Sequence, residues 1–365
     1  MTEADLLDRV RLSRTDGVGP ITFRKLLARF ATAAEALDAL PALARAGGRA
    51  TAPAIPAPST IRREMESVTR LGGRMLVLGG PDYPPLLALL DGAPPVLSVL
   101  GDPAALSARA VAVVGARNAS ANGQRMAEIL SADLALAGLI VVSGLARGID
   151  AAAHTGALST GRTVAAIAGG IDVPYPPENA ALQRLVAEGG AVVAEAPLGT
   201  APQARHFPRR NRIIAGLSLG CVVIEAAPRS GSLITARIAQ DEGREVFAVP
   251  GSPLDPRCRG SNDLLRSGAW LVETAADVTA NLPAAPGPAR LRGLAEPPAP
   301  WPEPPPDMNA ARERLLPLLS HSPTPVDDLV RRCQLSASAV NAALLELEVA
   351  GRVEILPGHM VTLVG

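Results

Sequence analysis

The middle of the chain, from about residue 71 to 282, alternates short apolar runs with longer segments of helical periodicity. The runs are rich in β-branched residues and apolar throughout, which is typical of strands covered by helices on both faces. This alternation predicts an α/β fold, a Rossmann-like doubly wound and mainly parallel sheet. We expect strands at Met75–Leu78, Val111–Val114, Leu139–Val142, Thr163–Ile167, Ala191–Ala194, Cys221–Ile224 and Glu245–Val249.

Residues 1–70 have the pattern of a small helical domain. A glycine-bracketed turn at Asp16–Pro20 precedes the amphipathic run from Phe23 to Phe30, an arrangement that resembles a helix-hairpin-helix. Such a turn either aims backbone N–H groups at a DNA phosphate or is a purely structural connection, and both interpretations stay open. Residues 283–306 are rich in proline, which predicts an extended linker.

Residues 307–365 predict three helices and a hairpin, the pattern of a winged helix. The expected elements are helices at Ala310–Leu319, Pro325–Arg332 and Ser336–Ala350, followed by strands at Val353–Leu356 and Met360–Leu363. This region has five arginines against seven acidic residues, so its net charge is negative and repels a phosphate backbone. We therefore expect it to bind a protein or its own dimer partner.

Composition and charge narrow the class of protein. A chain of 365 residues with only 2% aromatic residues favours two or three domains with aliphatic cores. The net charge is zero, so any affinity for nucleic acid must come from a local patch. The three cysteines form no CxxC pair, and neither a signal peptide nor a membrane-spanning run is evident, so we expect a cytoplasmic protein.

Small-residue loops follow three of the predicted strands. They are Gly115–Arg117, Ser143–Asp150 and Ser230–Thr235, and the last two lead into helices. Open α/β sheets bind ligands at the carboxyl edge, where glycines and helix starts favour anions, so the three loops together predict a phosphate-binding rim. A single loop of this kind is equally well explained as a tight turn between strand and helix.

The most strongly basic segment is Arg205–Arg212, which also contains Phe207. Guanidinium groups beside an aromatic ring suit single-stranded nucleic acid, because they pair with phosphates while the ring stacks on a base. The structural alternative is a solvated charged face with Phe207 in the core.

Residues that could carry out catalysis are few. Asp150 and His154 have helical i,i+4 spacing and could form an acid–base couple, but a structural hydrogen bond is the favoured interpretation. Neither a catalytic triad nor a metal-ligand spacing stands out, and Lys25, the only lysine, lies outside any phosphate-binding motif. The sequence therefore predicts neither an enzyme nor a bound metal or cofactor.

Taken in order along the chain, Gly115–Arg117, Ser143–Asp150 and the segment Phe207–Ser218 resemble motifs of the DNA-processing protein A (Smf) family. The resemblance extends over roughly Pro81 to Asp277. It implies a Rossmann-like domain that forms homodimers and binds single-stranded DNA in a basic pocket. It also implies a recombination mediator that protects incoming DNA and loads the RecA recombinase, as in natural transformation.

The resemblance also implies which residues bind DNA. The family pattern has a hydroxyl residue at the position of Ala116, so one phosphate contact is in doubt there. The implied DNA-binding residues are Gly115, Arg117, Ser143, Gly144, Arg147, Gly148, Arg205, Phe207, Arg209, Arg210, Asn211 and Arg212, with Ser230, Gly231, Ser232 and Thr235 as the neighbouring rim.

Two other classes of function compete with this one. Lysine-decarboxylase-like phosphoribohydrolases have a similar fold, and Glu225 lies beside a Ser-Gly-rich loop, but the segment Pro228–Thr235 departs from the PGGxGT loop of those enzymes. A transcription factor built on the winged helix is disfavoured by the acidic balance of residues 307–365.

Overall fold

The chain divides into two units, and the larger one contains the predicted α/β sheet. A computed structural model describes residues 1–284, 308–356 and 358–364. One unit is Glu64–Leu294, and the other combines Met1–Arg63 with Ala295–Gly365. The predicted linker, residues 283–306, lies outside the described residues except for its first two positions.

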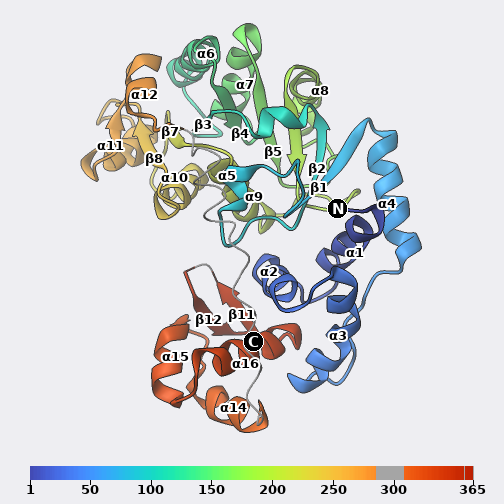
Figure 1. Ribbon diagram of the computed structural model, residues 1–365. Coiled ribbons are helices and arrows are strands. Elements are labelled where there is room, and N and C mark those ends of the chain that lie inside the picture. Colours follow the sequence, from blue (N-terminus) through green and yellow to red (C-terminus); the bar gives the residue numbers. More distant parts are fainter. Residues whose placement is uncertain (285–307, 357, 365) are drawn as a thin grey trace. The chain divides into compact units, whose positions relative to one another are not determined.

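The large unit is built on a nine-stranded sheet with the order β1-β2-β6-β5-β4-β3-β7-β8-β9 (Figure 1). The strands from β3 to β9 pair in parallel, whereas β1 and β2 are antiparallel at one edge. The bounds are β1 Gly73–Val77, β2 Val96–Gly101, β3 Ala110–Val114, β4 Ile140–Ser143, β5 Thr163–Ile167, β6 Ala191–Ala194, β7 Gly220–Val223, β8 Glu245–Ala248 and β9 Trp270–Leu271.

All seven predicted strands are present, so the α/β prediction is confirmed. Two strands, β2 and β9, are not evident from the apolar pattern of the sequence. β2 follows a proline pair and is interrupted by Ser98, and β9 has only two residues, both of them exposed. Neither strand gives the uninterrupted apolar run by which the others were recognised.

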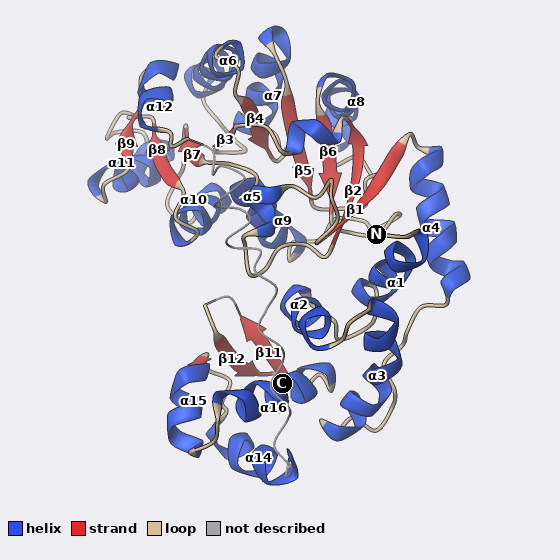
Figure 2. Ribbon diagram, viewed as in Figure 1, coloured by secondary structure: helices blue, strands red, loops and turns tan. Residues whose placement is uncertain are grey.

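Helices cover both faces of this sheet, as the apolar strands require (Figure 2). Figure 1 shows α6, α7 and α8 on one face and α9 and α10 on the other. Val111 and Val113 of β3 pack with residues of α6, α7 and α12 in one apolar core. The helices of this unit are α5 Pro85–Ala88, α6 Ala121–Leu136, α7 Ile149–Thr160, α8 Ala180–Gly189, α9 His206–Gly216, α10 Gly231–Asp241, α11 Arg259–Arg266 and α12 Ala275–Asn281.

The order of the strands places a topological switch point between β3 and β7. From β3 the chain adds β4, β5 and β6 on one side, and it then returns to add β7, β8 and β9 on the other side. Connections that depart from two adjacent parallel strands in opposite directions leave a crevice at their carboxyl ends, where ligands bind in open α/β sheets.

The second unit contains both the N-terminal helices and the winged helix. Its helices begin with α1 Glu3–Ser13, α2 Pro20–Arg29 and α3 Ala33–Ala46, while α4 Pro58–Arg70 crosses the boundary between the units. The winged helix consists of α14 Met308–Leu315, β10 Thr324–Pro325, α15 Val326–Cys333, α16 Ala337–Val349, β11 Val353–Leu356 and β12 Met360–Leu363. Ser336 caps α16, since its hydroxyl accepts from the Ala339 N–H at 3.2 Å. Within the described ranges, no helix has both the length and the apolarity needed to cross a bilayer.

A buried polar contact joins α7 to the sheet at His154. The ring is fully buried, and its Nδ1 lies 2.7 Å from the Thr163 hydroxyl, which itself donates to the Val141 carbonyl. Burial, aided by the charge of Arg210, lowers the pKa of His154 from 6.5 to about 3. The favoured structural interpretation of His154 therefore agrees with its surroundings, because the ring stays neutral within the core.

This burial makes stability depend on pH. Below about pH 6.5 the unfolded chain binds a proton at His154 that the folded chain does not bind until about pH 3. We therefore expect His154 to lower the free energy of unfolding by about 1.4 kcal/mol for each pH unit below 6.5. Urea unfolding at pH 7.5 and pH 5 should show a weaker pH dependence for His154→Gln than for the wild type. Equal pH dependence in both proteins would contradict the assignment.

Candidate nucleic-acid interface

The loop after β3 and the start of α9 meet at one side-chain cluster. The guanidinium carbon of Arg117 lies 4.7 Å from the centroid of the Phe207 ring, and that of Arg210 lies 6.0 Å from it. Arg117 is exposed and Phe207 is half-buried. Two segments far apart in the sequence thus present cations and an aromatic face to the same place, as the sequence analysis expected for Arg117 and Phe207.

A pocket of about 400 Å³ opens beside Phe207, at the carboxyl ends of β3, β4 and β5. The Tyr175 ring is tilted by 55° against the Phe207 ring, with 5.7 Å between the centroids. An aromatic pair therefore forms part of the wall. The lining residues include Arg117, Asn118, Gly144, Ala146, Arg147, Ile167, Gly169, Tyr175, Phe207 and Arg210.

A second pocket of about 620 Å³ adjoins the first at the switch point between β3 and β7. Both pockets share Arg117, Phe207 and Arg210 in their walls. The second pocket also includes the start of α10, where the Ser230 hydroxyl caps the helix by accepting from the Ser232 N–H. Its lining residues include Gly115, Asn118, Asp150, Asn211, Arg229, Ser230, Gly231, Ser232, Thr235 and Arg257.

Arg210 carries a buried charge and lines both pockets. Its side chain is 6% exposed, and its Nη1 donates to the Ala166 carbonyl at 2.8 Å. Burial lowers the pKa of Arg210 to about 10, so the guanidinium stays protonated at neutral pH. Its Nε is buried without a hydrogen-bond partner in the described part of the chain. A buried donor of this kind favours contact with a ligand or water.

Asp150 balances part of this charge from the start of α7. Burial raises the pKa of the Asp150 carboxyl, while the charge of Arg210 and the N–H groups of Ala146 and Gly144 oppose that effect. Gly144 leaves the space that Arg210 occupies, since a Cβ at this position would lie 1.8 Å from the arginine Nη1. The acid–base couple that the spacing of Asp150 and His154 left possible is not formed: His154 contacts Thr163, and Asp150 faces Arg210.

Several other predicted residues support the pockets from behind, and of the three described here Asn211 also lines the second pocket. The Ser143 hydroxyl is buried and donates to the Val113 carbonyl at 2.6 Å, so it joins β4 to β3. Asn211 donates to the Gly231 carbonyl at 3.3 Å and thereby ties α9 to α10. Gly148 has a φ of +74° at the start of α7, a conformation that favours glycine. These residues shape the site from behind.

The arginines of the basic segment Arg205–Arg212 do not all face the pockets. Arg210 lines both pockets, whereas Arg205, Arg209 and Arg212 line neither of them. Arg212 forms an ion pair with Glu195 at 2.5 Å, and Arg209 lies 3.8 Å from the same carboxylate. Arg205 is exposed just before α9. The helical spacing of α9 explains the division, because successive arginines point in different directions around the helix.

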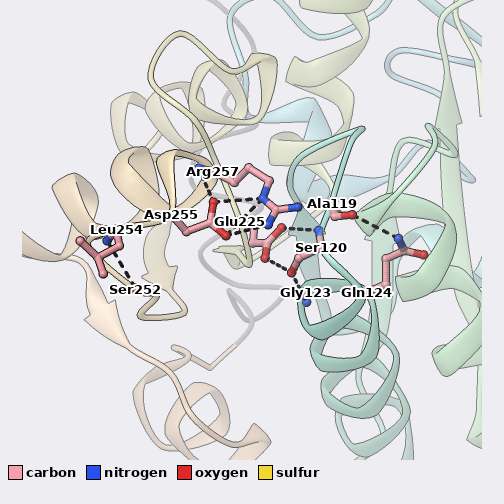
Figure 3. Close-up of polar contacts among 9 residues, drawn as sticks. All are labelled: Ala119, Ser120, Gly123, Gln124, Glu225, Ser252, Leu254, Asp255 and Arg257. Atoms are coloured by element: carbon pink, nitrogen blue, oxygen red, sulfur yellow. Dashed lines mark hydrogen bonds and ion pairs between the residues drawn. The ribbon is translucent and has the colours of Figure 1, made fainter.

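The pockets also contain residues that were not among the predicted site residues. Four of these carry an amide, an aromatic ring or a guanidinium group: Asn118, Tyr175, Arg229 and Arg257. Asn118 and Arg229 directly flank the recognised loops Gly115–Arg117 and Ser230–Thr235, so their positions in the sequence could have pointed to them. Arg147, by contrast, was among the predicted site residues; it lines the first pocket, where it pairs with Glu178. Arg257 comes from a segment with no sequence motif, and it is held by Asp255 at 2.8 Å (Figure 3).

Glu225 lies at the end of β7, in a contact that fixes the start of α6. Its carboxylate accepts from the Ser120 N–H at 2.9 Å and from the Ser120 hydroxyl, which in turn accepts from the Gly123 N–H (Figure 3). Both carboxylate oxygens are therefore occupied by the first turn of α6. Glu225 therefore anchors the start of α6 beside the pocket. Because both of its oxygens accept from Ser120, its carboxylate is not placed as a free catalytic base. Among the described residues, no three His, Cys, Asp or Glu side chains gather in a way that could hold a metal ion.

Comparison with known proteins places this site in a family. The model described as DNA recombination-mediator protein A matches residues 74–283. A DprA winged helix domain matches residues 296–359, and a DprA-like N-terminal helix-hairpin-helix domain matches residues 3–67. Together the three models follow the order of the predicted domains.

Two curated relatives that match most of the chain belong to the same family. Protein Smf of Synechocystis is 33% identical over 95% of this chain and 96% of its own length. Protein Smf of Escherichia coli is 40% identical over 77% of this chain and 75% of its own length.

Solved structures show the same fold. DNA processing protein A of Streptococcus pneumoniae is similar with a TM-score of 0.60 at 40% identity, covering 63% of this chain and 80% of that structure. The structure of DNA processing protein A from Helicobacter pylori, which concerns its single-stranded DNA binding mode, has a TM-score of 0.52 at 27% identity. The match covers 57% of this chain and 95% of that structure. The chain belongs to the DNA-processing protein A (DprA/Smf) family of DNA recombination mediators.

Proposed function

We propose that this protein binds single-stranded DNA across the two adjoining pockets of its α/β unit. The observation that carries the proposal is the placement of the Arg117 guanidinium over the Phe207 ring, in a wall that both pockets share. A cation beside a ring that lines the pockets provides a phosphate contact and a stacking surface within the span of one nucleotide. The single-stranded DNA binding of the Helicobacter pylori relative supports the same assignment.

The two pockets suit different parts of a nucleotide. The aromatic pair of Tyr175 and Phe207 in the first pocket suits an unstacked base, which a duplex does not present. The start of α10 and Arg229 in the second pocket suit the phosphate backbone. Arg210 lies between them and keeps its charge at neutral pH. Selectivity for single strands follows, because a paired and stacked base cannot enter the first pocket.

We further propose that the bound complex protects incoming DNA and loads the RecA recombinase, as in natural transformation, and that the protein acts as a homodimer. The family membership supports both statements. Strand β9 forms an edge of the sheet with Trp270 and Leu271 about half exposed, which gives a second copy an apolar surface to cover. We place this activity in the cytoplasm, where the three buried free cysteines remain reduced.

The alternative of a nucleotide hydrolase is less well supported. Its best candidate for a catalytic carboxylate, Glu225, has both oxygens engaged by Ser120. The loop at Ser230–Ser232 supplies anion-binding groups, and these serve DNA equally well. Release of free base from a nucleoside monophosphate by the purified protein would restore the hydrolase hypothesis.

Removal of the Arg117 guanidinium should weaken DNA binding and reduce its dependence on salt. For Arg117→Ala we expect lower affinity for an unstructured oligonucleotide and a log–log salt slope that is smaller by about 0.7, the value for one phosphate contact on a single strand. Fluorescence anisotropy across a salt series measures both quantities. The matched control is Arg162→Ala, because Arg162 precedes β5 at the amino end of the sheet and pairs with Asp102. An unchanged slope in Arg117→Ala, or an equal change in Arg162→Ala, contradicts the site.

The Phe207 ring should contribute by stacking, which has a different signature. We expect Phe207→Leu to lose about 1–3 kcal/mol of binding free energy with little change in the salt slope, since a base loses its aromatic partner. Phe207→Tyr keeps the ring and should bind nearly as well as the wild type. The same titration distinguishes them, and equal affinity of the leucine and tyrosine variants would show that no base stacks there.

Loading of the recombinase should depend on the same pocket. On single-stranded DNA coated with single-strand-binding protein, we expect the wild-type chain to shorten the lag before RecA hydrolyses ATP. Arg117→Ala should lose this effect and Arg162→Ala should retain it. If the wild type binds the DNA but leaves the lag unchanged, DNA binding stands and the loading function does not.

A further inference from the structure

The last helix of the winged helix is apolar on two opposite faces. One face of α16 carries Val340, Ala343, Leu344 and Leu347, which belong to the core of the winged helix. The other face carries a second set with helical spacing, and it too is buried: Ala339, Ala342, Leu345 and Val349 are at most 1% exposed. A helix with two apolar faces needs a partner on each of them. The winged helix provides only one of the two covers.

The second face is covered by the N-terminal helices. In the unit that joins Met1–Arg63 to the winged helix, α16 packs against α2 and α3. The fit is closest at the end of α3, where Gly47 has an ordinary φ of −71°. A Cβ at Gly47 would lie 2.0 Å from the Glu346 carbonyl oxygen and 2.7 Å from the Cβ of Ala350. This contact between two backbones leaves no room for a side chain.

Charges buried in this contact come from both sides of it. Glu348 of α16 is 9% exposed, and its Oε1 accepts from the Ile355 N–H at 3.4 Å. Lys25 of α2, the only lysine of the chain, lies half-buried near it. Burial lowers the pKa of Lys25 and raises that of Glu348, and the charge of each residue opposes the effect on the other. A buried carboxylate is tolerated when an opposite charge compensates it.

We propose that α2 and α3 are the docking partner of α16, so that the first and last domains of this chain form one module in which α16 is a protein contact. In helix-turn-helix proteins the second helix of the motif, the position of α16 after α15, enters the major groove. Here that helix is enclosed, it contains no arginine or lysine, and its two charged residues are Glu346 and Glu348. The winged helix therefore does not recognise duplex DNA through α16. This inference does not depend on the proposed single-stranded DNA site, because the residues concerned belong to the other unit.

Hydrogen exchange in the full-length protein tests the docking. We expect Gly47→Ala to raise the exchange rate of the α16 amides by about tenfold or more, because overpacking this contact weakens the protection that α3 provides. The matched control is Gly19→Ala, since Gly19 also has an ordinary φ and a Cβ there meets nothing within 4 Å. Equal α16 protection in the wild type and Gly47→Ala overturns the proposal. Exchange in β3–β7 should stay unchanged in both variants.

A second set of variants covers the possibility that Gly47→Ala fails to fold. Lys25→Met and Glu348→Gln should each lower the melting temperature of the winged helix, because each leaves a buried charge uncompensated. The double variant should recover most of that loss, since neither charge remains. Strictly additive effects would show that the two side chains do not share an interface.

The consequence for DNA is tested on the same samples. Addition of duplex DNA to the wild type should leave the exchange of α16 unchanged, while addition of single-stranded DNA should protect the pockets of the other unit if the proposed function holds. Protection of α16 by duplex DNA overturns the inference and leaves the single-stranded DNA site untouched. Failure of single strands to protect the pockets overturns the proposed function alone.

Discussion

The buried guanidinium of Arg210 is the interaction on which the candidate site depends. It fixes the first turn of α9 to the carboxyl end of β5 through the Ala166 carbonyl, and it compensates Asp150 at the start of α7. With α9 held there, Phe207 lies under the Arg117 guanidinium, and the two pockets acquire a common wall. An arginine that looks from the sequence like one more surface cation is thus the centre of the arrangement.

The switch point explains why cations from distant segments converge. The loops after β3, β4 and β7 belong to separate βαβ units, but β7 inserts next to β3 and brings their carboxyl ends together. A protein with zero net charge thereby gains a local cluster of cations. Because the chain as a whole has no net charge, the position of the basic residues on the sheet matters more than their number.

Most of the fold and part of the site could be predicted from the sequence. The apolar runs gave seven of the strands, and the glycine loops located Arg117 and Arg147 at the right edge. The orientation of side chains around α9 could not be predicted, so Arg212 was assigned to the pocket although it pairs with Glu195. Nor could the sequence show that Ser143 faces the core, since a hydroxyl at a strand end serves a ligand or a neighbouring carbonyl equally well.

The nearly complete use of arginine in place of lysine fits both units. Arginine keeps its charge when buried, as Arg210 does, and it packs well over an aromatic ring, as Arg117 does over Phe207. Lysine gives up its charge more readily on burial, and its point charge lacks the planar face that stacking requires. Lys25 is half-buried in a contact between helices, where its charge compensates the carboxylate of Glu348 and no ring is stacked. The choice of cation at each position thus follows from whether a planar, permanently charged group is needed there.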